Sequence, residues 1–366
     1  MRIFHVGPDQ FVELDALPEA LPASGFIWIG SARREFEVRS AELQSRLQAW
    51  NCGPLVDLHV SDLLNQQLPS NFDSTSWYDL LVFRRLALGA GSEASMADDA
   101  MLTPSGARKA LASIDTSPVG FAIFDRVLLT VHPADCAVRD HFAHRLMQQG
   151  SGAESRGSSR LPSSPADLML RMANHMVDSY LALRRVLTRH LGTLQSELLD
   201  PKSRFGDWKL LLDARNTLHV LEDTCEDQRS AIQEWIDVLD EWPSESEAVA
   251  QRERELLRLR SRDVLEHIER VLTHVRRLEH SAEVAVQMHF SALGHRTNDI
   301  MRTLTVLTAI FLPLNLITGF FGMNFDTLPL IHSATGIWTA VAVMALVGVG
   351  LIVYFRRKRY LGTQKK

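Results

Sequence analysis

Residues 303–325 read TLTVLTAIFLPLNLITGFFGMNF, and residues 336–355 read GIWTAVAVMALVGVGLIVYF. Neither stretch contains Lys, Arg, Asp or Glu. Each reaches the roughly 20 apolar residues that a helix needs to cross the hydrocarbon core of a bilayer. One such run can be a buried core helix, but two in tandem, followed by four basic residues at 356–359, predict a transmembrane hairpin. Trp338, Tyr354 and Tyr360 lie near the ends of the second run, where aromatic rings favour the membrane interface.

The charges that flank these runs predict an orientation. The connection at 322–335 has no Lys or Arg, whereas the tail after Phe355 has six. Because Lys and Arg accumulate on the cytosolic side, we expect the tail and residues 1–302 to be cytosolic, in a multi-pass protein of the cell (inner) membrane. The N-terminus lacks the long apolar region of a signal peptide. The three cysteines show no CxxC spacing, which fits a reducing compartment.

The average composition hides this division. The 366 residues are 46% hydrophobic and carry a net charge of −5, which excludes a disordered chain and disfavours a nucleic-acid partner. Residues 1–302, however, contain 43 acidic and 33 basic residues. This acidic body is paired with a basic tail, and an acidic field attracts cations.

A long helix is predicted to lead into the first span. Between 244 and 321 the only proline is Pro313, and apolar or small residues alternate in steps of four and three, which is a heptad seam. The seam residues are Leu257, Ser261, Val264, Ile268, Val271, Val275, Leu278, Ala282 and Ala285. Two amphipathic segments, 166–199 and 209–242, precede this helix and complete a predicted helical bundle. In the first of them Met169, Met172 and Met176 are expected to be core residues.

Polar residues recur along one side of the first span: Asn298, Thr305, Thr308 and Asn315. Polar groups that face lipid are costly, so these side chains must face other helices or water. Two interpretations remain open. The residues form hydrogen bonds that hold a helical bundle together, or they line a water-filled pore. One chain has too few spans to enclose a pore, so the second interpretation requires a homo-oligomer.

Residues 1–145 are typical of a mixed α/β domain with one sheet. Strands are predicted at 2–6, 26–29, 80–88, 119–124 and 126–130, and helices at 41–50, 60–65 and 103–113. The predicted fold is therefore an α+β cytosolic domain (1–145), a flexible linker (146–165), a helical stalk bundle (166–302), and two C-terminal transmembrane helices (303–321 and 336–355). An extracytoplasmic loop (322–335) joins the spans, and a basic cytosolic tail (356–366) follows.

The sequence shows no motif for covalent chemistry. It has no GxxxxGK[ST], GxGxxG, HExxH or GxSxG pattern, so we expect neither an enzyme nor a bound cofactor. His132, His141 and His144 are close enough in sequence to form a metal site. Scattered histidines without a shared role are the favoured interpretation.

The first span ends in Gly322-Met323-Asn324, directly before the short loop. Upstream come Thr297-Asn298, Met301, Leu304-Thr305, Phe311-Leu312-Pro313 and Gly319, and a second span and a basic tail follow. Together these features resemble the CorA-type divalent metal ion transporters, closely over the C-terminal third and loosely over the whole chain. The resemblance implies a funnel-shaped homopentamer that conducts divalent cations and contacts membrane lipid.

By this resemblance, Asn324 of each subunit forms a ring at the outer mouth, Gly322 and Met323 shape the loop, and Asp326 supplies one acidic group. Mg²⁺ gives up its waters reluctantly, so amide oxygens can hold the hydrated ion without stripping it. The implied pathway is lined by Asn298, Met301, Leu304, Thr305, Thr308, Leu312, Asn315 and Gly319. Among these, Met301, Leu304 and Leu312 are candidates for a hydrophobic gate.

A second segment, Arg262-Asp263-Val264-Leu265-Glu266-His267, resembles the family segment whose Asp binds regulatory divalent ions between cytosolic subunits. This implies a regulatory carboxylate at Asp263, whereas an ordinary solvated charge is the alternative. Mg²⁺, with Co²⁺ and Ni²⁺, is favoured as cargo because it is the commoner one in the family. Leu330, which stands where magnesium-type members often have Glu, is closer to the zinc branch, so Zn²⁺ transport stays open. A membrane-anchored coiled-coil signalling or scaffold protein is the alternative from another class.

Overall fold

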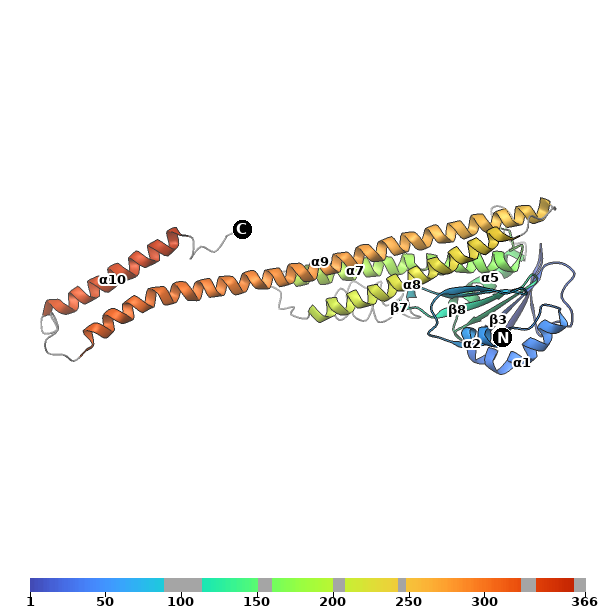
Figure 1. Ribbon diagram of the computed structural model, residues 1–366, viewed down its shortest axis with the longest axis horizontal. Helices are drawn as coiled ribbons and strands as arrows, with labels where there is room; N and C mark the ends of the chain where they lie inside the picture. Colours follow the sequence, from blue (N-terminus) through green and yellow to red (C-terminus); the bar gives the residue numbers. More distant parts are fainter. Residues whose placement is uncertain (89–113, 151–159, 200–207, 243–247, 324–333, 359–366) are drawn as a thin grey trace. The chain divides into compact units, whose positions relative to one another are not determined.

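The computed structural model describes residues 1–88, 114–150, 160–199, 208–242, 248–323 and 334–358 (Figure 1). The chain forms two compact units, Met1–Ala285 and Val286–Lys366. Helix α9 (Ala248–Phe321) belongs to both, because it runs without a break through the boundary between them.

A seven-stranded sheet, with strand order β2-β1-β3-β9-β8-β5-β4, organises the N-terminal part of the first unit. Its strands are β1 (Arg2–Val6), β2 (Phe11–Leu14), β3 (Phe26–Ala32), β4 (Asn71–Ser74), β5 (Asp79–Arg84), β8 (Pro118–Ile123) and β9 (Val127–His132). β3 and β9 are parallel, and the other neighbours are antiparallel. A separate short pair is formed by β6 (Ala87–Leu88) and β7 (Ile114–Asp115). The predicted strands 2–6, 26–29, 119–124 and 126–130 are confirmed, with small shifts at their ends. The single strand predicted at 80–88 is wrong, because the chain divides there into β5 and β6, and β6 belongs to a second sheet.

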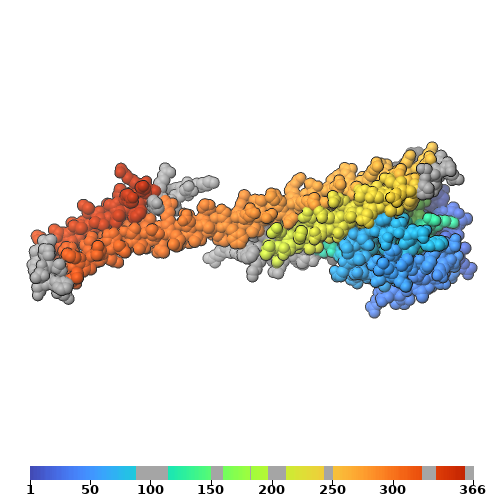
Figure 2. Space-filling model, in the orientation of Figure 1, coloured from blue at the N-terminus to red at the C-terminus, as the bar shows by residue number. Residues whose placement is uncertain are grey.

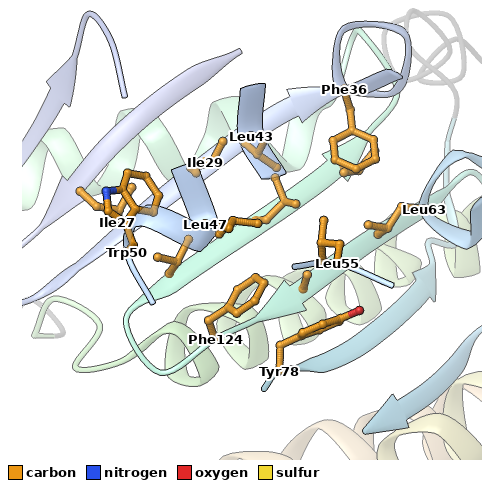
Figure 3. Close-up of a cluster of buried hydrophobic side chains, with 14 of the residues drawn as sticks. Ile27, Ile29, Phe36, Leu43, Leu47, Trp50, Leu55, Leu63, Tyr78 and Phe124 are labelled. Carbon is orange, nitrogen blue, oxygen red and sulfur yellow. The ribbon is translucent and has the colours of Figure 1, made fainter. Parts of the chain in front are cut away.

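Helices cover both faces of this sheet. α1 (Arg33–Ala49) and α2 (Asp57–Leu64) lie on one face, whereas α5 (Ala137–Gly150) and α6 (Pro165–Asp178) lie on the other. Figure 3 shows the core between the sheet and α1–α2, in which Ile29, Leu47 and Phe124 meet. Because both faces are covered, β8 and β9 are buried along their whole length, as apolar central strands require.

Two helices of this region differ from the prediction. α1 starts at Arg33 rather than Ala41, because β3 passes directly into the helix at Ala32. α5 continues to Gly150, so residues 146–150, which we assigned to the linker, are helical. The predicted helix at 103–113 and the rest of the linker up to residue 159 lie outside the described residues.

The helical bundle contains α6, α7 (Tyr180–Leu199), α8 (Trp208–Glu241) and the first part of α9. The prediction of one helix over 166–199 is wrong at Ser179, where the chain breaks into α6 and α7. The Ser179 hydroxyl lies 2.6 Å from the Met176 carbonyl oxygen and 3.1 Å from that of Leu86. Such side-chain bonds to backbone carbonyls compete with regular helix geometry.

The predicted heptad seam is confirmed. Every seam residue from Leu257 to Ala285 is at most 9% exposed. α7 and α8 cover it: Trp235 Nε1 on α8 donates to Ser261 Oγ at 2.9 Å, and the Tyr180 hydroxyl on α7 lies 2.7 Å from His274 Nδ1. Met169, Met172 and Met176 are buried core residues, as predicted.

A buried carboxylate joins α6 to α9. Asp167 is 1% exposed, and its two oxygens lie 2.9 Å from Arg171 Nη2 and 2.9 Å from Arg260 Nε. Asp167 also stands in the first turn of α6, where its N–H donates to Ser164 Oγ at 3.3 Å. The carboxylate is therefore paired on both sides, as a buried charge must be.

In the second unit, α10 (Ala334–Arg357) packs along the C-terminal part of α9 (Figure 2). Both helices are long and apolar enough to cross a membrane. Large apolar side chains face outward from both: Leu316 is 73% exposed and Trp338 is 76% exposed. An apolar surface of this extent, on helices of this length, is typical of membrane-spanning segments. The α/β domain, the long helix and the two C-terminal apolar helices are thus confirmed.

Candidate functional site

The candidate pathway is one face of α9, from the last turn of the stalk before residue 303 through the predicted span. All its predicted residues are exposed in the single chain: Asn298, Met301, Leu304, Thr305, Thr308, Leu312, Asn315 and Gly319. α10 covers another face, which includes Val306 (2% exposed) and the partly buried Ile310 and Ile317. At about 100° per residue the two faces are centred roughly 150° apart on the helix. α10 therefore leaves the polar face open.

Two threonines on this face do not need the polar surroundings that the sequence pattern predicts for them. The Thr305 hydroxyl donates to the Met301 carbonyl oxygen at 2.8 Å, and Thr308 donates to that of Leu304 at 2.9 Å. Their hydrogen-bonding needs are met within the helix, so they require neither water nor another helix. The side-chain amides of Asn298 and Asn315, by contrast, make no hydrogen bond within the described part of the chain. Asn315, which lies inside the predicted span, carries the argument for a polar environment there.

The pathway face ends at a tight helix terminus. The Gly322 N–H donates to the Thr318 carbonyl oxygen at 2.9 Å, and α9 stops at Phe321. A Cβ added at Gly322 would lie 3.0 Å from that same oxygen, so a larger residue would crowd the end of the helix. Met323 is 46% exposed. Asn324 and Asp326, which complete the predicted selectivity loop, lie outside the described residues.

The predicted regulatory residue Asp263 lies on an exposed part of α9, one turn before His267. His267 Nε2 is 3.8 Å from Asp263 Oδ1, and His267 Nδ1 is 3.1 Å from Asp178 Oδ1 at the end of α6. Asp178 and Asp263 also line the same cavity of about 230 Å³. Sequence reasoning missed Asp178, because no spacing pattern connects the end of α6 with the middle of α9.

Further oxygen donors surround the two carboxylates. Asn174 and Gln149 line the cavity, and Asn174 Oδ1 and Gln149 Oε1 are buried without a hydrogen-bond partner among the described residues. Carboxylate and amide oxygens are the ligands that hard cations such as Mg²⁺ prefer. Three arginines also line this cavity, and Arg171 and Arg260 among them are paired with Asp167.

The histidines considered as a metal site are not brought together. His132 is 1% exposed, and its Nδ1 lies 2.7 Å from the Pro133 carbonyl oxygen. His141 instead stacks on His175, with ring centroids 4.2 Å apart. Burial, followed by the charge of His141, lowers the pKa of His175. His132 and His141 therefore belong to different environments.

One other group of metal-ligating side chains occurs in the described ranges. Ligand atoms of His219 and Glu222 on α8 and Glu279 on α9 lie within 4.8 Å of one another. A hydrogen bond from Arg276 holds the pKa of Glu222 below its usual range, with Arg276 Nε 2.6 Å from Glu222 Oε1. An arginine thus already balances the charge at this position.

Comparison with known proteins supports the assignment of this chain. Residues 103–357 match the model of the CorA-like Mg²⁺ transporter protein family. The cobalt/magnesium transport protein CorA of Thermotoga maritima is 24% identical over 194 residues, which cover 53% of this chain and 52% of that protein. The magnesium transport protein CorA of Yersinia pseudotuberculosis is 31% identical over 101 residues, covering 28% of this chain and 32% of that protein.

The fold of the whole chain has a counterpart among solved structures. The CorA magnesium transporter from Methanocaldococcus jannaschii superposes with a TM-score of 0.72 and 18% identity, covering 98% of each chain. In the two sequence matches above, the aligned part spans about half of one relative and about a third of the other. The family model covers well over half of this chain. The chain therefore belongs to the CorA-like Mg²⁺ transporter family.

Proposed function

We propose that this chain transports divalent metal cations through a homo-oligomeric pore, with Mg²⁺, and also Co²⁺ and Ni²⁺, as its cargo. The observation that carries the proposal is the open polar face of α9, which lies opposite the α10-covered face and leads to Gly322-Met323. Family membership and the names of the relatives, which are magnesium or cobalt/magnesium transport proteins, support the choice of cargo.

In this proposal, several copies of α9 turn their polar faces toward a common axis, and the family resemblance favours five. The Asn315 amide then contacts water and the hydrated ion, which removes the cost of placing it in lipid, and the Asn298 amide lies at the cytosolic end of the same path. Met301, Leu304 and Leu312 narrow the path by hydrophobic constriction, which gates a pore by dewetting. Asn324 forms the outer ring that receives the hydrated ion, and Asp326 adds one negative charge per subunit.

Regulation is proposed at the cavity that Asp178 and Asp263 share. A divalent ion bound there screens the two carboxylates and the acid excess of residues 1–302. The occupied site favours a closed arrangement of subunits, and the empty site lets them separate. In the same proposal the protein lies in the inner membrane of the cell, with residues 1–302 and the tail in the cytosol.

Flux into liposomes that contain the purified protein tests the transport proposal. Wild-type protein should admit Mg²⁺, Asn324→Ala should lose most of this flux, and Thr339→Ala on α10 should retain it. If Asn324→Ala leaves the flux unchanged, the selectivity ring is refuted. Parallel measurements with Zn²⁺, with and without a proton gradient, decide the cargo: faster Zn²⁺ than Mg²⁺ entry would replace magnesium by zinc as the proposed substrate.

The scaffold alternative loses its main support in the structure. A coiled-coil signalling protein needs a free heptad seam for its partner. Here the seam from Leu257 to Ala285 is buried against α7 and α8 of the same chain. The seam is therefore used inside the subunit, so transport is the function that the geometry favours.

A further inference from the structure

A second cavity, of about 530 Å³, lies at one edge of the sheet, far along the chain from the metal pathway. β3 and β9 are parallel and end there together, since Ala32 and His132 are register partners. β5 ends at the same edge with Arg84, opposite Pro118 of β8. α1 starts at this edge, directly after β3. In α/β folds, ligands bind at the edge where parallel strands end and the following helix begins.

The lining of this cavity is strongly basic. Arg33, Arg34 and Arg84 line it, and none of them pairs with a carboxylate among the residues that the structure describes. The single acidic residue of the lining, Asp115, is paired with Arg85 and accepts a hydrogen bond from the Ser117 N–H at 2.9 Å. Arg33 donates to the Pro118 carbonyl oxygen and Arg84 to that of Leu68 at 2.8 Å, and these neutral acceptors leave the lining with a net positive charge that an anion would neutralise.

Several hydrogen-bonding groups at this edge lack a partner. Arg33 Nε is buried without one among the described residues, and so is Nε2 of His132, a residue that is 1% exposed and lines the cavity. Ala32 is the N-cap of α1 and makes no side-chain cap bond, so the first N–H groups of this helix stay available. Such a helix N-terminus attracts phosphate and carboxylate groups.

His132 also indicates what else the ligand carries. Its Nδ1 lies 2.7 Å from the Pro133 carbonyl oxygen, so that nitrogen bears the hydrogen and donates it. In the neutral imidazole the unpartnered Nε2 is then an acceptor. An acceptor beside an anion site suits a hydroxyl group of the same ligand. A cavity of this volume falls within the range of small-molecule sites.

We propose that this cavity binds a small phosphorylated compound that also carries hydroxyl groups, such as a nucleotide or a sugar phosphate. Arg33, Arg34, Arg84 and the first turn of α1 hold the phosphate, and His132 Nε2 accepts a hydrogen bond from a hydroxyl. The site stands on its own geometry and does not rest on the transport proposal.

Calorimetric titration of the full-length protein in detergent, with EDTA present, tests the proposal. Adenosine 5′-monophosphate is the probe, and adenosine and inorganic phosphate are the comparison ligands. Adenosine monophosphate should bind saturably and more tightly than either. Arg34 is exposed and has no described partner, so Arg34→Glu should fold and should weaken binding by about tenfold or more, as loss of a charge-assisted contact does.

The matched control is Arg39→Glu, a charge reversal on the same helix outside the cavity, which should change the affinity by less than about twofold. No binding of adenosine monophosphate, equal binding of adenosine, or equal effects of the two variants would overturn the proposal. If inorganic phosphate binds as tightly as the nucleotide, the hydroxyl contact with His132 is refuted and only the phosphate site stands.

Discussion

Acidification should destabilise this fold through one buried histidine, His132. His132 is the last residue of β9. Burial lowers the pKa of its imidazole to about 4, against about 6.5 in an unfolded chain. The charged groups that face it are Arg139 and Asp140 on α5 and Arg33 on α1. At a pH between these two values, His132 is protonated in the unfolded chain and neutral in the folded chain. The free energy of unfolding therefore falls as the pH drops from about 6.5 toward 4.

The size of this effect follows from the same two values. A difference of one pKa unit corresponds to about 1.4 kcal/mol, so the full window contributes about 3 kcal/mol. Between pH 7 and pH 5, the linkage relation predicts a loss of about 2 kcal/mol from His132 alone. His141, His175, His190 and His274 also have lowered pKa values because of burial, and they add to the slope of the wild-type protein.

Denaturant unfolding of the full-length protein, followed by tryptophan fluorescence at pH 7 and pH 5, measures this term. His132→Gln cannot take up the proton, so its loss of stability between the two pH values should be smaller than that of wild type by about 2 kcal/mol. The other histidines contribute equally to both proteins and cancel in the difference. An identical pH dependence in His132→Gln and wild type would refute the reasoning.

Three further predictions follow from named contacts. Asp167→Asn leaves two arginines without their buried carboxylate and should lower the free energy of unfolding by about 3 kcal/mol, whereas the exposed Asp237→Asn should cost under about 0.5 kcal/mol in the same denaturation assay. Asn315→Leu should slow Mg²⁺ flux into liposomes at least about tenfold, because it replaces an amide of the proposed pore by an apolar group; unchanged flux would remove this position from the pathway. Asp178→Asn should weaken Mg²⁺-dependent protection from protease as Asp263→Asn does, and wild-type protection in either variant would separate that residue from the proposed regulatory site.

The parts of the fold that the sequence predicts are those that local periodicity determines. The seam of α9 repeats every three to four residues because one side of a helix must be buried, and each of its positions up to Ala285 is buried. The strands of the sheet are recognisable for a similar reason, since apolar runs such as 119–123 must lie between two covering layers. The break at Ser179 escapes prediction because it depends on a contact with Leu86, a residue far away in sequence.

The residues of the candidate sites also fall into those that local spacing predicts and those that only the packing of distant segments brings together. The polar face of α9 is visible from spacing alone, because its members share one helix. The meeting of Asp178 with Asp263, and of Arg33 with Arg84, is set by how separate elements pack, and no short-range pattern records it. The bonds from Thr305 and Thr308 to their own helix depend on side-chain rotamers, which a sequence pattern does not show.

Different helices cover the surface of α9 along its length, and one part of this surface stays uncovered in the single chain. This difference supports an oligomeric assembly. Up to Ala285 the apolar seam of α9 is buried by helices of the same chain. Within the span, α10 covers only the face that contains Val306, and the amide of Asn315 on the far side has no partner in the described chain. A lone hairpin would expose this amide to lipid, at a cost that membrane helices avoid. Copies of the chain that turn Asn315 inward would remove that cost and enclose a polar path, so this one side chain supports both the proposed oligomer and the proposed pore.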